Sequence, residues 1–434
     1  MNTRSLTFFT LDAIKGNYLK WHLNAVKEKI ESQTTAEDRE DLTKLLKHST
    51  GSTVFYRKYN SRSIDDFPVI NKNTVRKAPE TFLSSQFSKR KLHRMVTSGS
   101  TGTPFETFQD ANKRLRSTAD TIYFANLAGY DLGQPLYYLK IWSELNKKSK
   151  LTQWVQNIHP VDVLHLDNKK IESLLKELKN KKSTKHILGY SSALEKVAKF
   201  LEEKNISMHE CKVGSIISMS EALDDVTKDT LHERLGVVPC SRYSNIENGI
   251  IAQQTPTSGS TFLVNIASYY VEIFGLNENR HAKPGELGRI VVTDLYNYGM
   301  PLIRYDTGDL GVISVDKSGG IDRTKLTRVE GRKLDTLLDT KGNIISSYII
   351  YKNMWKYTEI DQYQLIQEGP RNYTFKINVH NGFSREVQLR NEFLSYLGAD
   401  ADFNIEYVNE IPLLNSGKRR KVVNNYLKSK KASQ

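Results

Sequence analysis

The chain has 434 residues, 38% of them hydrophobic and 26% charged, which is typical of a folded globular protein and excludes a disordered one. No run approaches the roughly 18 uncharged apolar residues of a membrane-spanning helix, and two cysteines, Cys211 and Cys240, are too few for a disulfide framework or a four-cysteine zinc site. The formal net charge of +14 favours an anionic partner: nucleic acid, an anionic membrane surface, or a phosphorylated or acidic substrate.

The beginning of the chain favours a cytoplasmic protein. A short apolar patch at Leu6–Leu11 lacks the small-residue cleavage site of a signal peptide. Both cysteines lie in apolar, strand-like runs, where a buried free thiol is the expected state. We therefore expect the protein in the cytoplasm.

Helices are predicted over most of residues 1–60, with polar connections at Ser32–Glu40 and Lys47–Thr53. A strand-like alternation follows at Phe105–Phe108, and a longer helical pattern covers Ala111–Leu127. Between these two regions lies a stretch with a different composition.

The stretch Thr97–Pro104 reads Thr-Ser-Gly-Ser-Thr-Gly-Thr-Pro. Glycine lets a backbone turn tightly and approach a ligand closely, and successive amide groups in such a turn form a concave anion site. Hydroxyl groups from four neighbouring residues would add hydrogen-bond donors for phosphate oxygens: Ser98, Ser100, Thr101 and Thr103. No Gly-Lys-Ser/Thr follows, so it is not a Walker A loop. The alternative interpretation is a solvated Ser/Gly loop.

Strands and helices alternate regularly from His186 onward. Apolar runs predict strands at His186–Gly189, Val213–Met219 and Val237–Tyr243, and helical patterns lie between them. This alternation predicts a largely parallel sheet with crossover helices.

Polar clusters follow two of these strands, where ligands of parallel sheets gather. They are Ser220-Glu221-Ala222 and Tyr243-Ser244-Asn245-Ile246-Glu247. The next strands, Thr261–Phe274 and Gly288–Val292, indicate a more twisted, antiparallel region. Beyond Asp335, two helices between three strands predict a small separate α+β domain; the helices are Ser347–Tyr357 and Ser384–Leu397, and the strands Gln362–Gln367, Tyr373–Val379 and Phe403–Val408.

Five short motifs in this order resemble those of the adenylate-forming superfamily of acyl-CoA synthetases, peptide-synthetase adenylation domains and luciferases. The resemblance covers residues 80–425 and is closest to the phenylacetate–CoA ligase branch, which includes the CapK-like proteins of capsular and surface polysaccharide synthesis. It implies an α/β fold. A large domain with mixed and parallel sheets and crossover helices, residues 1–334, would bind ATP and the acid. A small, mobile α+β lid, residues 335–434, would carry the catalytic lysine.

The resemblance assigns a role to each motif. The loop Ser98–Pro104, with Gly99 and Gly102, would hold the β- and γ-phosphates of ATP, although Thr103 stands where many relatives have lysine. Glu221 falls in the adenine segment, without that segment's usual proline. Tyr243 would stack on adenine, and Glu247 would hold Mg²⁺, a hard cation that needs oxygen ligands.

The later motifs complete the nucleotide site. Tyr305–Asp309 matches the Tyr-x-Thr-Gly-Asp motif, so Asp309 would bind the ribose hydroxyls together with Arg332. Asp335 falls at the hinge between the domains, and Lys418, in Asn415–Lys418, matches the catalytic lysine. As a bare string, the Lys418 region also reads as a solvated basic tail.

The resemblance implies Mg-ATP-dependent activation of a carboxylic acid to an acyl-adenylate, with pyrophosphate release. Transfer to an acceptor thiol, amine or hydroxyl would follow, with coenzyme A or a glycan-linked group as the acceptor, in surface-polysaccharide biosynthesis. Polar residues in and after the Tyr243–Gln253 segment suggest a polar acid and not the aromatic acid of a phenylacetate–CoA-type ligase; they are Asn245, Asn248, Gln253 and Gln254.

Other classes of function remain as alternatives. A catalytically inactive nucleotide-binding protein would keep the same motifs. A nucleic-acid-binding protein would use the basic tail Lys418–Lys431, but the aromatic residues of a single-strand binding groove are not interleaved there, so we expect no nucleic-acid partner. The positive charge also suits peripheral association with an anionic membrane surface.

Overall fold

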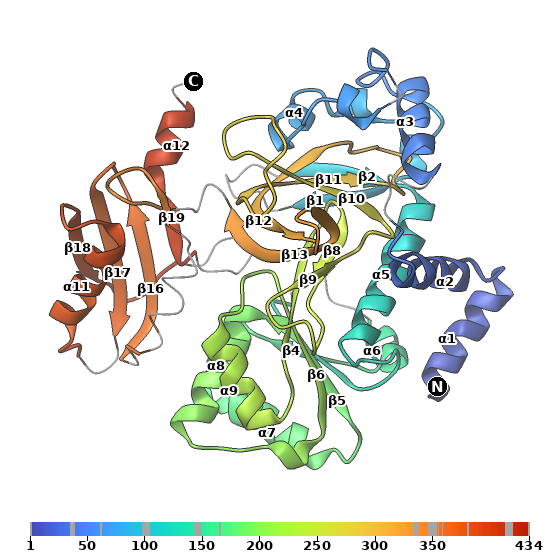
Figure 1. Cartoon of the computed structure of the whole chain (residues 1–434). Helices are drawn as coiled ribbons and strands as arrows, with labels where there is room; N and C mark the ends of the chain where they lie inside the picture. Colours follow the sequence, from blue (N-terminus) through green and yellow to red (C-terminus); the bar gives the residue numbers. More distant parts are fainter. Residues whose placement is uncertain are drawn as a thin grey trace. The chain divides into compact units, whose positions relative to one another are not determined.

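The computed structural model describes residues 2–34, 40–60, 63–97, 105–142, 149–164, 166–332, 337–345, 354, 356–357, 359–379, 382–412 and 420–432. The chain divides into two units (Figure 1). The first consists of Met1–Leu223, Thr227–Thr307 and Gly311–Val329; the second consists of Asp224–Val226, Gly308–Leu310 and Glu330–Gln434. None of the helices in the described ranges is long and apolar enough to cross a membrane.

The first unit begins with three helices, α1 (Thr3–Ile14), α2 (Tyr18–Glu31) and α3 (Glu40–Ser52). The prediction of a connection at Lys47–Thr53 is wrong, because α3 continues to Ser52. Hydroxyl groups in its last turns donate back to carbonyl oxygens of the preceding turn, so these polar residues satisfy their own hydrogen bonds within the helix; the donors include Ser49, Thr50 and Ser52.

Short elements connect these helices to a hairpin. They are η1 (Ile64–Asp66), α4 (Lys72–Lys77), η2 (Pro79–Phe82) and η3 (Lys89–Lys91). Asn71 caps α4 through a capping box with Thr74, which fixes where this short helix begins. The hairpin consists of the antiparallel strands β1 (His93–Thr97) and β2 (Phe105–Gln109), and α5 (Ala111–Leu127) follows, as predicted.

One eleven-stranded sheet forms the centre of the unit, in the order β10-β11-β12-β13-β9-β8-β7-β6-β5-β3-β4. One half contains β3 (Leu136–Lys140), β4 (Ile158–Asp162), β5 (Lys185–Tyr190), β6 (Val213–Met219) and β7 (Cys240–Asn245). The other half contains β8 (Gly249–Gln253), β9 (Phe262–Val264), β10 (Tyr269–Phe274), β11 (Gly288–Asp294), β12 (Tyr305–Val315) and β13 (Ile321–Arg332).

The strand directions confirm the predicted mixed α/β class. Neighbouring strands from β4 to β7 pair in parallel, whereas β7 pairs antiparallel with β8. Helices connect the parallel strands: α6 (Lys150–Gln156), α7 (Asn168–Asn180), α8 (Ser191–Glu203), η4 (His209–Cys211) and α9 (Asp225–Leu235). Figure 1 shows α7, α8 and α9 beside β4, β5 and β6.

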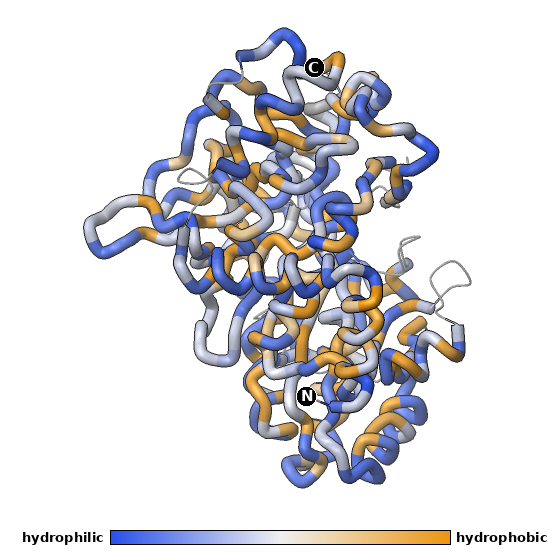
Figure 2. Tube along the Cα trace, turned by 90° about the vertical axis from the view of Figure 1, so that its right-hand side faces the viewer, coloured by the Kyte–Doolittle hydropathy of each residue, from blue (hydrophilic) through white to orange (hydrophobic). Residues whose placement is uncertain are grey.

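Hydrophobic residues recur along the strands and on one side of the helices (Figure 2). The main core joins buried side chains of α2 and α5 to those of the sheet, such as Val26, Phe124 and Ile251. Burying one such aliphatic side chain contributes about 1.5–3 kcal/mol. The helix α5 therefore lies against the sheet through apolar contacts, and its position is fixed from both sides.

The second unit has its own core and sheets. Its four-stranded sheet, in the order β18-β17-β16-β19, contains β16 (Ile360–Gln367), β17 (Asn372–Val379), β18 (Asp402–Tyr407) and β19 (Val422–Asn424). The other elements are β14 (Leu337–Leu338), β15 (Ile344–Ile345), α11 (Glu386–Leu397) and α12 (Asn425–Ala432). The strands and the helix predicted between 362 and 408 are confirmed, and the helix predicted at Ser347–Tyr357 lies largely outside the described residues.

Candidate functional site

Glu247 lies in the turn between β7 and β8, and its side chain is only 2% exposed. Lys72 at the start of α4 forms an ion pair with its carboxylate, with 2.7 Å between Nζ and Oε1. The hydroxyl of Tyr305, at the start of β12, donates to the same oxygen at 3.1 Å. Because both contacts use Oε1, Oε2 is left for a further ligand. A carboxylate oxygen suits Mg²⁺, so the donor chemistry at Glu247 fits the predicted cation.

A bridge between distant segments brings Lys72 to this carboxylate. Ile70 donates its amide to the carbonyl of Arg304 at 3.0 Å and accepts from the amide of Asp306 at 2.7 Å. This pairing fixes the segment before α4 alongside the start of β12. Lys72 therefore reaches Glu247 although 175 residues separate them in the sequence.

Arg304 anchors the start of β12 in a left-handed backbone conformation, with φ at 50°. Its guanidinium binds both carboxylate oxygens of the buried Glu272, at 2.8 and 3.2 Å, and also Asp65. His281 lies 3.3 Å from the same guanidinium. The cluster of Asp65, Glu272 and His281 thus already binds a cation of the protein, the guanidinium of Arg304, and this contact holds the strand that carries Tyr305.

The predicted phosphate loop, Ser98–Thr103, lies outside the described residues, but both of its ends are described. Thr97 and Phe105 are paired in the β1–β2 hairpin, so the loop begins and ends at one place. The ring of Phe105 stacks on that of Tyr305, with 6.3 Å between centroids, and Lys72 Nζ lies 5.4 Å from the Phe105 centroid. The end of the loop thus meets the two residues that contact Glu247.

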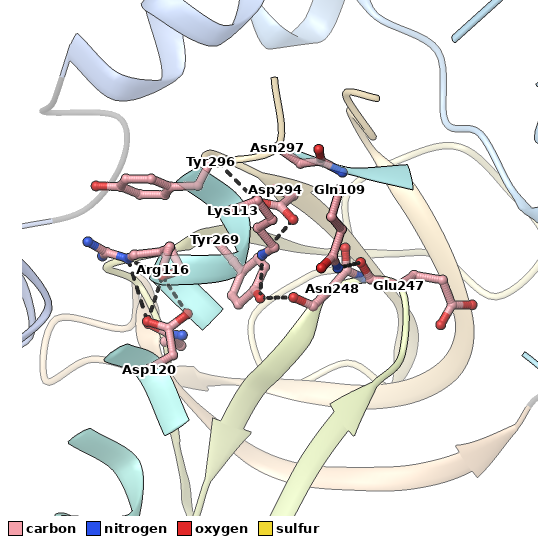
Figure 3. Close-up of polar contacts among 12 residues, drawn as sticks. Gln109, Lys113, Arg116, Asp120, Glu247, Asn248, Tyr269, Asp294, Tyr296 and Asn297 are labelled. Atoms are coloured by element: carbon pink, nitrogen blue, oxygen red, sulfur yellow. Dashed lines mark hydrogen bonds and ion pairs between the residues drawn. The ribbon is translucent and has the colours of Figure 1, made fainter. Parts of the chain in front are cut away.

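A buried polar network holds the Glu247 turn from the other side (Figure 3). The amide side chain of Gln109 donates to the carbonyl of Glu247 at 3.0 Å, and the hydroxyl of Tyr269 donates to the carbonyl of Asn248. Lys113 donates to the Tyr269 hydroxyl at 2.9 Å and forms an ion pair with Asp294 at 2.7 Å. All these side chains are at most 2% exposed, so the turn is rigidly positioned.

Burial sets the protonation states in this network. It raises the pKa of the Tyr269 phenol well above its ordinary value, and the negative charge of Asp294 acts in the same direction. The phenol is therefore protonated at neutral pH and can donate to the carbonyl of Asn248.

Tyr243 links the aromatic-x-x-x-Glu motif to the Tyr-x-Thr-Gly-Asp motif. Its hydroxyl donates to Oγ1 of Thr307 at 3.1 Å, and Thr307 donates to the carbonyl of Ile290 at 3.0 Å. Tyr243 is largely buried in the core around α5. The structure therefore brings these two motifs together, and adenine stacking by Tyr243 stays a prediction.

Asp309 follows Gly308 on β12, where φ is 82° and glycine is the residue that adopts this conformation without strain. Arg332 is the last residue of β13. The carboxylate of Glu221 accepts from the amide of Ser192 at 3.2 Å, in the first turn of α8, where a negative charge is favourable. No described contact joins Glu221 to Glu247. The predicted hinge Asp335 and the predicted catalytic Lys418 lie outside the described residues.

Sequence reasoning missed Lys72 and Gln109, and gave no role to the Tyr305 side chain. No local pattern marks Lys72, because only the bridge from Ile70 to β12 brings it to the site. A weak signal did exist for Tyr305, since it begins a recognised motif.

Comparisons with known proteins agree with this architecture. Residues 337–425 match the family model described as the CapK C-terminal domain. Protein CapK of Staphylococcus aureus is 23% identical over 381 residues, which cover 85% of this chain and 82% of that relative.

Among solved structures, 2-hydroxyisobutyryl-CoA ligase in the postadenylation state, in complex with R3-HIB-AMP, superposes with a TM-score of 0.70. The identity is 15%, and 94% of each chain is covered. ATP-bound MatB from Rhodopseudomonas palustris has a TM-score of 0.55 at 14% identity, covering 76% of this chain and 66% of that one.

Proposed function

We propose that this chain, which is similar to CapK and has the fold of the adenylate-forming ligases, activates a carboxylic acid with Mg-ATP. The acid would become an acyl-adenylate, with release of pyrophosphate, and its acyl group would then pass to a nucleophile. The observation that carries this proposal is the meeting of three motifs around Glu247. There Phe105, which follows the predicted phosphate loop in the β1–β2 hairpin, stacks on Tyr305, the first residue of its motif. Tyr305 and Lys72 in turn contact the buried carboxylate of Glu247.

The first half-reaction forms one bond and breaks another. A carboxylate oxygen of the acid attacks the α-phosphorus of ATP, and the bond from that phosphorus to the bridging oxygen of the β-phosphate breaks, so pyrophosphate leaves with the electron pair. Negative charge builds up on the transferring and leaving groups, and fixed positive charge nearby stabilises it. Mg²⁺, when held by Glu247, would supply part of this charge.

Lys72 supplies a second cation at this place. The phosphate loop has Thr103 where many relatives have lysine, and Phe105, two residues later, lies under the ammonium of Lys72. We therefore assign Lys72 the charge that the loop lacks. Its ammonium also forms the ion pair with the buried Glu247 carboxylate, at 2.7 Å.

The remaining roles follow the motifs. Phosphates would be held by the hydroxyls and amides of Ser98–Thr103, adenine by Tyr243 and the Glu221 segment, and the ribose by Asp309 and Arg332. Lys418 would approach the α-phosphate during adenylation. Rotation about Asp335 would then withdraw the small domain, residues 335–434, from the large one, residues 1–334, as hinges at a few positions permit.

In the second half-reaction the acceptor attacks the carbonyl carbon and AMP leaves. The acceptor is the thiol of coenzyme A, or an amine or hydroxyl of a glycan precursor. Capsule or surface-polysaccharide assembly in the cytoplasm is the proposed setting, and the CapK resemblance supports it. The net charge of +14 suits a phosphorylated acceptor or one bound at an anionic membrane.

ATP–pyrophosphate exchange tests the proposal. Purified protein, Mg²⁺, ATP and labelled pyrophosphate are incubated with aromatic, short acyl, amino and uronic acids, each alone. Exchange that depends on one class of acid is the expected result and identifies that class. Measurable ATP binding without exchange for any acid would instead favour a binding-only protein.

A further inference from the structure

Arg242 lies on β7, at the border between the parallel and antiparallel halves of the sheet. Its Nε donates to Oε1 of Gln253 on β8 at 2.7 Å, and Gln253 donates in turn to the carbonyl of Phe124 on α5 at 2.6 Å. The guanidinium is thus oriented by a neutral side chain that is itself fully buried and fixed.

The other side of this guanidinium has no partner. Nη2 of Arg242 is buried and makes no hydrogen bond, and no carboxylate of the described residues forms an ion pair with Arg242. By contrast, the fully buried Lys113 and Arg116 each have a carboxylate beside them, Asp294 and Asp120. Arg242 differs from that pattern.

The groups near Arg242 do not neutralise it. Burial lowers the pKa of Arg242 to about 10, and the neighbouring Tyr138 and Cys240 act in the opposite direction, so it is charged at neutral pH. Burial also raises the pKa of Tyr138 to about 12 and that of Cys240 to about 11, so both are neutral there. Arg242 as a whole is half-buried, and a partly desolvated positive charge without an anion is costly, so such charges are normally paired.

The position of Arg242 is that of a substrate-binding group. The hydroxyl of Tyr138 lies 3.8 Å from the sulfur of Met219, the last residue of β6, so these side chains gather at the carboxyl ends of parallel strands. Arg242 is three residues before the end of β7 at Asn245, about 10 Å along the strand. The Glu247 turn follows that end.

We propose that Arg242 binds a second anionic group of the acid substrate, a carboxylate or a phosphate several bonds away from the reacting carboxylate. The planar guanidinium of arginine can bind either group through two parallel hydrogen bonds, and Nη2 offers the donors. The site would then hold a doubly anionic acid, with one anion near Arg242 and the other near the Glu247 turn. This inference rests on the proposed function, because it names the acid that the same site activates.

Matched pairs of acids test it. Succinate and its half-amide succinamate differ in one charge at nearly constant shape, as do glutarate and glutaramate; 3-phosphoglycerate and glycerate provide the phosphate arm. Binding of each acid is measured by calorimetry with ATP and Mg²⁺ withheld, and ATP–pyrophosphate exchange is measured separately. The variants are R242Q, R242K and R234Q. Arg234 is the matched control, because its guanidinium already binds Glu202 at 2.9 Å on the surface of the same unit.

The wild-type protein and R234Q should bind an acid with two anionic groups at least about 30-fold more tightly than the partner that carries the reacting carboxylate alone, the usual effect of removing one member of a buried charge pair. R242Q should lose this preference, and R242K, which keeps the charge without the planar fork, should retain part of it. A preference within the succinate or glutarate pair would identify the second anionic group as a carboxylate, and a preference for 3-phosphoglycerate over glycerate would identify it as a phosphate.

Equal binding of both members of every pair, or an undiminished preference in folded R242Q, would overturn the inference. A preference that depends on Arg242 in calorimetry, combined with no exchange for any acid, would support the inference and refute the proposed adenylation. ATP–pyrophosphate exchange with acids that R242Q binds as tightly as the wild type would support the proposed adenylation and refute the inference about Arg242.

Discussion

Replacing Lys72 by methionine removes the positive charge beside Glu247 and keeps most of the side-chain volume. The Glu247 carboxylate would remain 2% exposed, and among the described residues the hydroxyl of Tyr305 would be its remaining side-chain donor. An ionised group in that position has lost most of its water and its counter-charge, so the folded state becomes less stable.

The size of the effect follows from the burial of the two partners. Breaking a fully buried ion pair costs about 3–5 kcal/mol. Lys72 is 27% exposed, so water screens part of this interaction, and we expect a loss of about 2 kcal/mol at pH 7.

Urea unfolding of four proteins at pH 7 measures this effect: wild type, K72M, E247Q and the double variant. K77M is the matched control, since Lys77 is an exposed lysine at the end of the same helix. K72M should lose much less stability in the E247Q background than in the wild type. An equal loss in both backgrounds, or a loss no larger than that of K77M, would refute the reasoning.

Three further predictions concern other residues. Lys418→Ala should reduce acid-dependent exchange at least about 100-fold and leave ATP affinity unchanged; undiminished exchange would remove its catalytic role. Tyr269→Phe should cost about 1–2 kcal/mol in urea unfolding, because the carbonyl of Asn248 and the ammonium of Lys113 each lose a partner; unchanged stability would contradict this. Burial lowers the pKa of His186 from 6.5 to about 4. Between these pH values the unfolded chain binds more protons than the folded chain, so the free energy of unfolding decreases as the pH is lowered. His186→Gln should remove part of this decrease in stability. A pH profile of stability parallel to that of the wild type would contradict this prediction.

Regular patterns made most of the fold predictable. The alternation of apolar runs and helices after His186 corresponds to the parallel half of the sheet, and α5 matches its predicted range. These elements follow from local hydrophobic periodicity. The prediction was wrong in the last turns of α3, where a cluster of hydroxyl residues is typical of a loop. In the structure these hydroxyls donate to backbone carbonyls one turn earlier in the helix, which the sequence alone does not reveal.

The candidate site was predictable only in part. Glu247 and Tyr305 both belong to motifs that have a recognisable spacing, although the sequence assigned a role to the side chain of Glu247 and none to that of Tyr305. Lys72 and Gln109 reach Glu247 through long-range pairing, and no short-range pattern encodes such contacts. The sequence likewise could not predict that Arg242 lacks a counter-charge, because this depends on which side chains surround the guanidinium in the folded chain.

The transfer of oxygen from the acid to AMP tests the central claim most directly. The acid identified by exchange is labelled with ¹⁸O in its carboxylate and incubated with ATP, Mg²⁺ and the acceptor, and the products are analysed by mass spectrometry. Adenylation predicts AMP that carries one ¹⁸O atom, because the bridging oxygen of the acyl-adenylate comes from the acid and leaves with AMP. Unlabelled AMP, or ¹⁸O in inorganic phosphate with ADP as the nucleotide product, would contradict it.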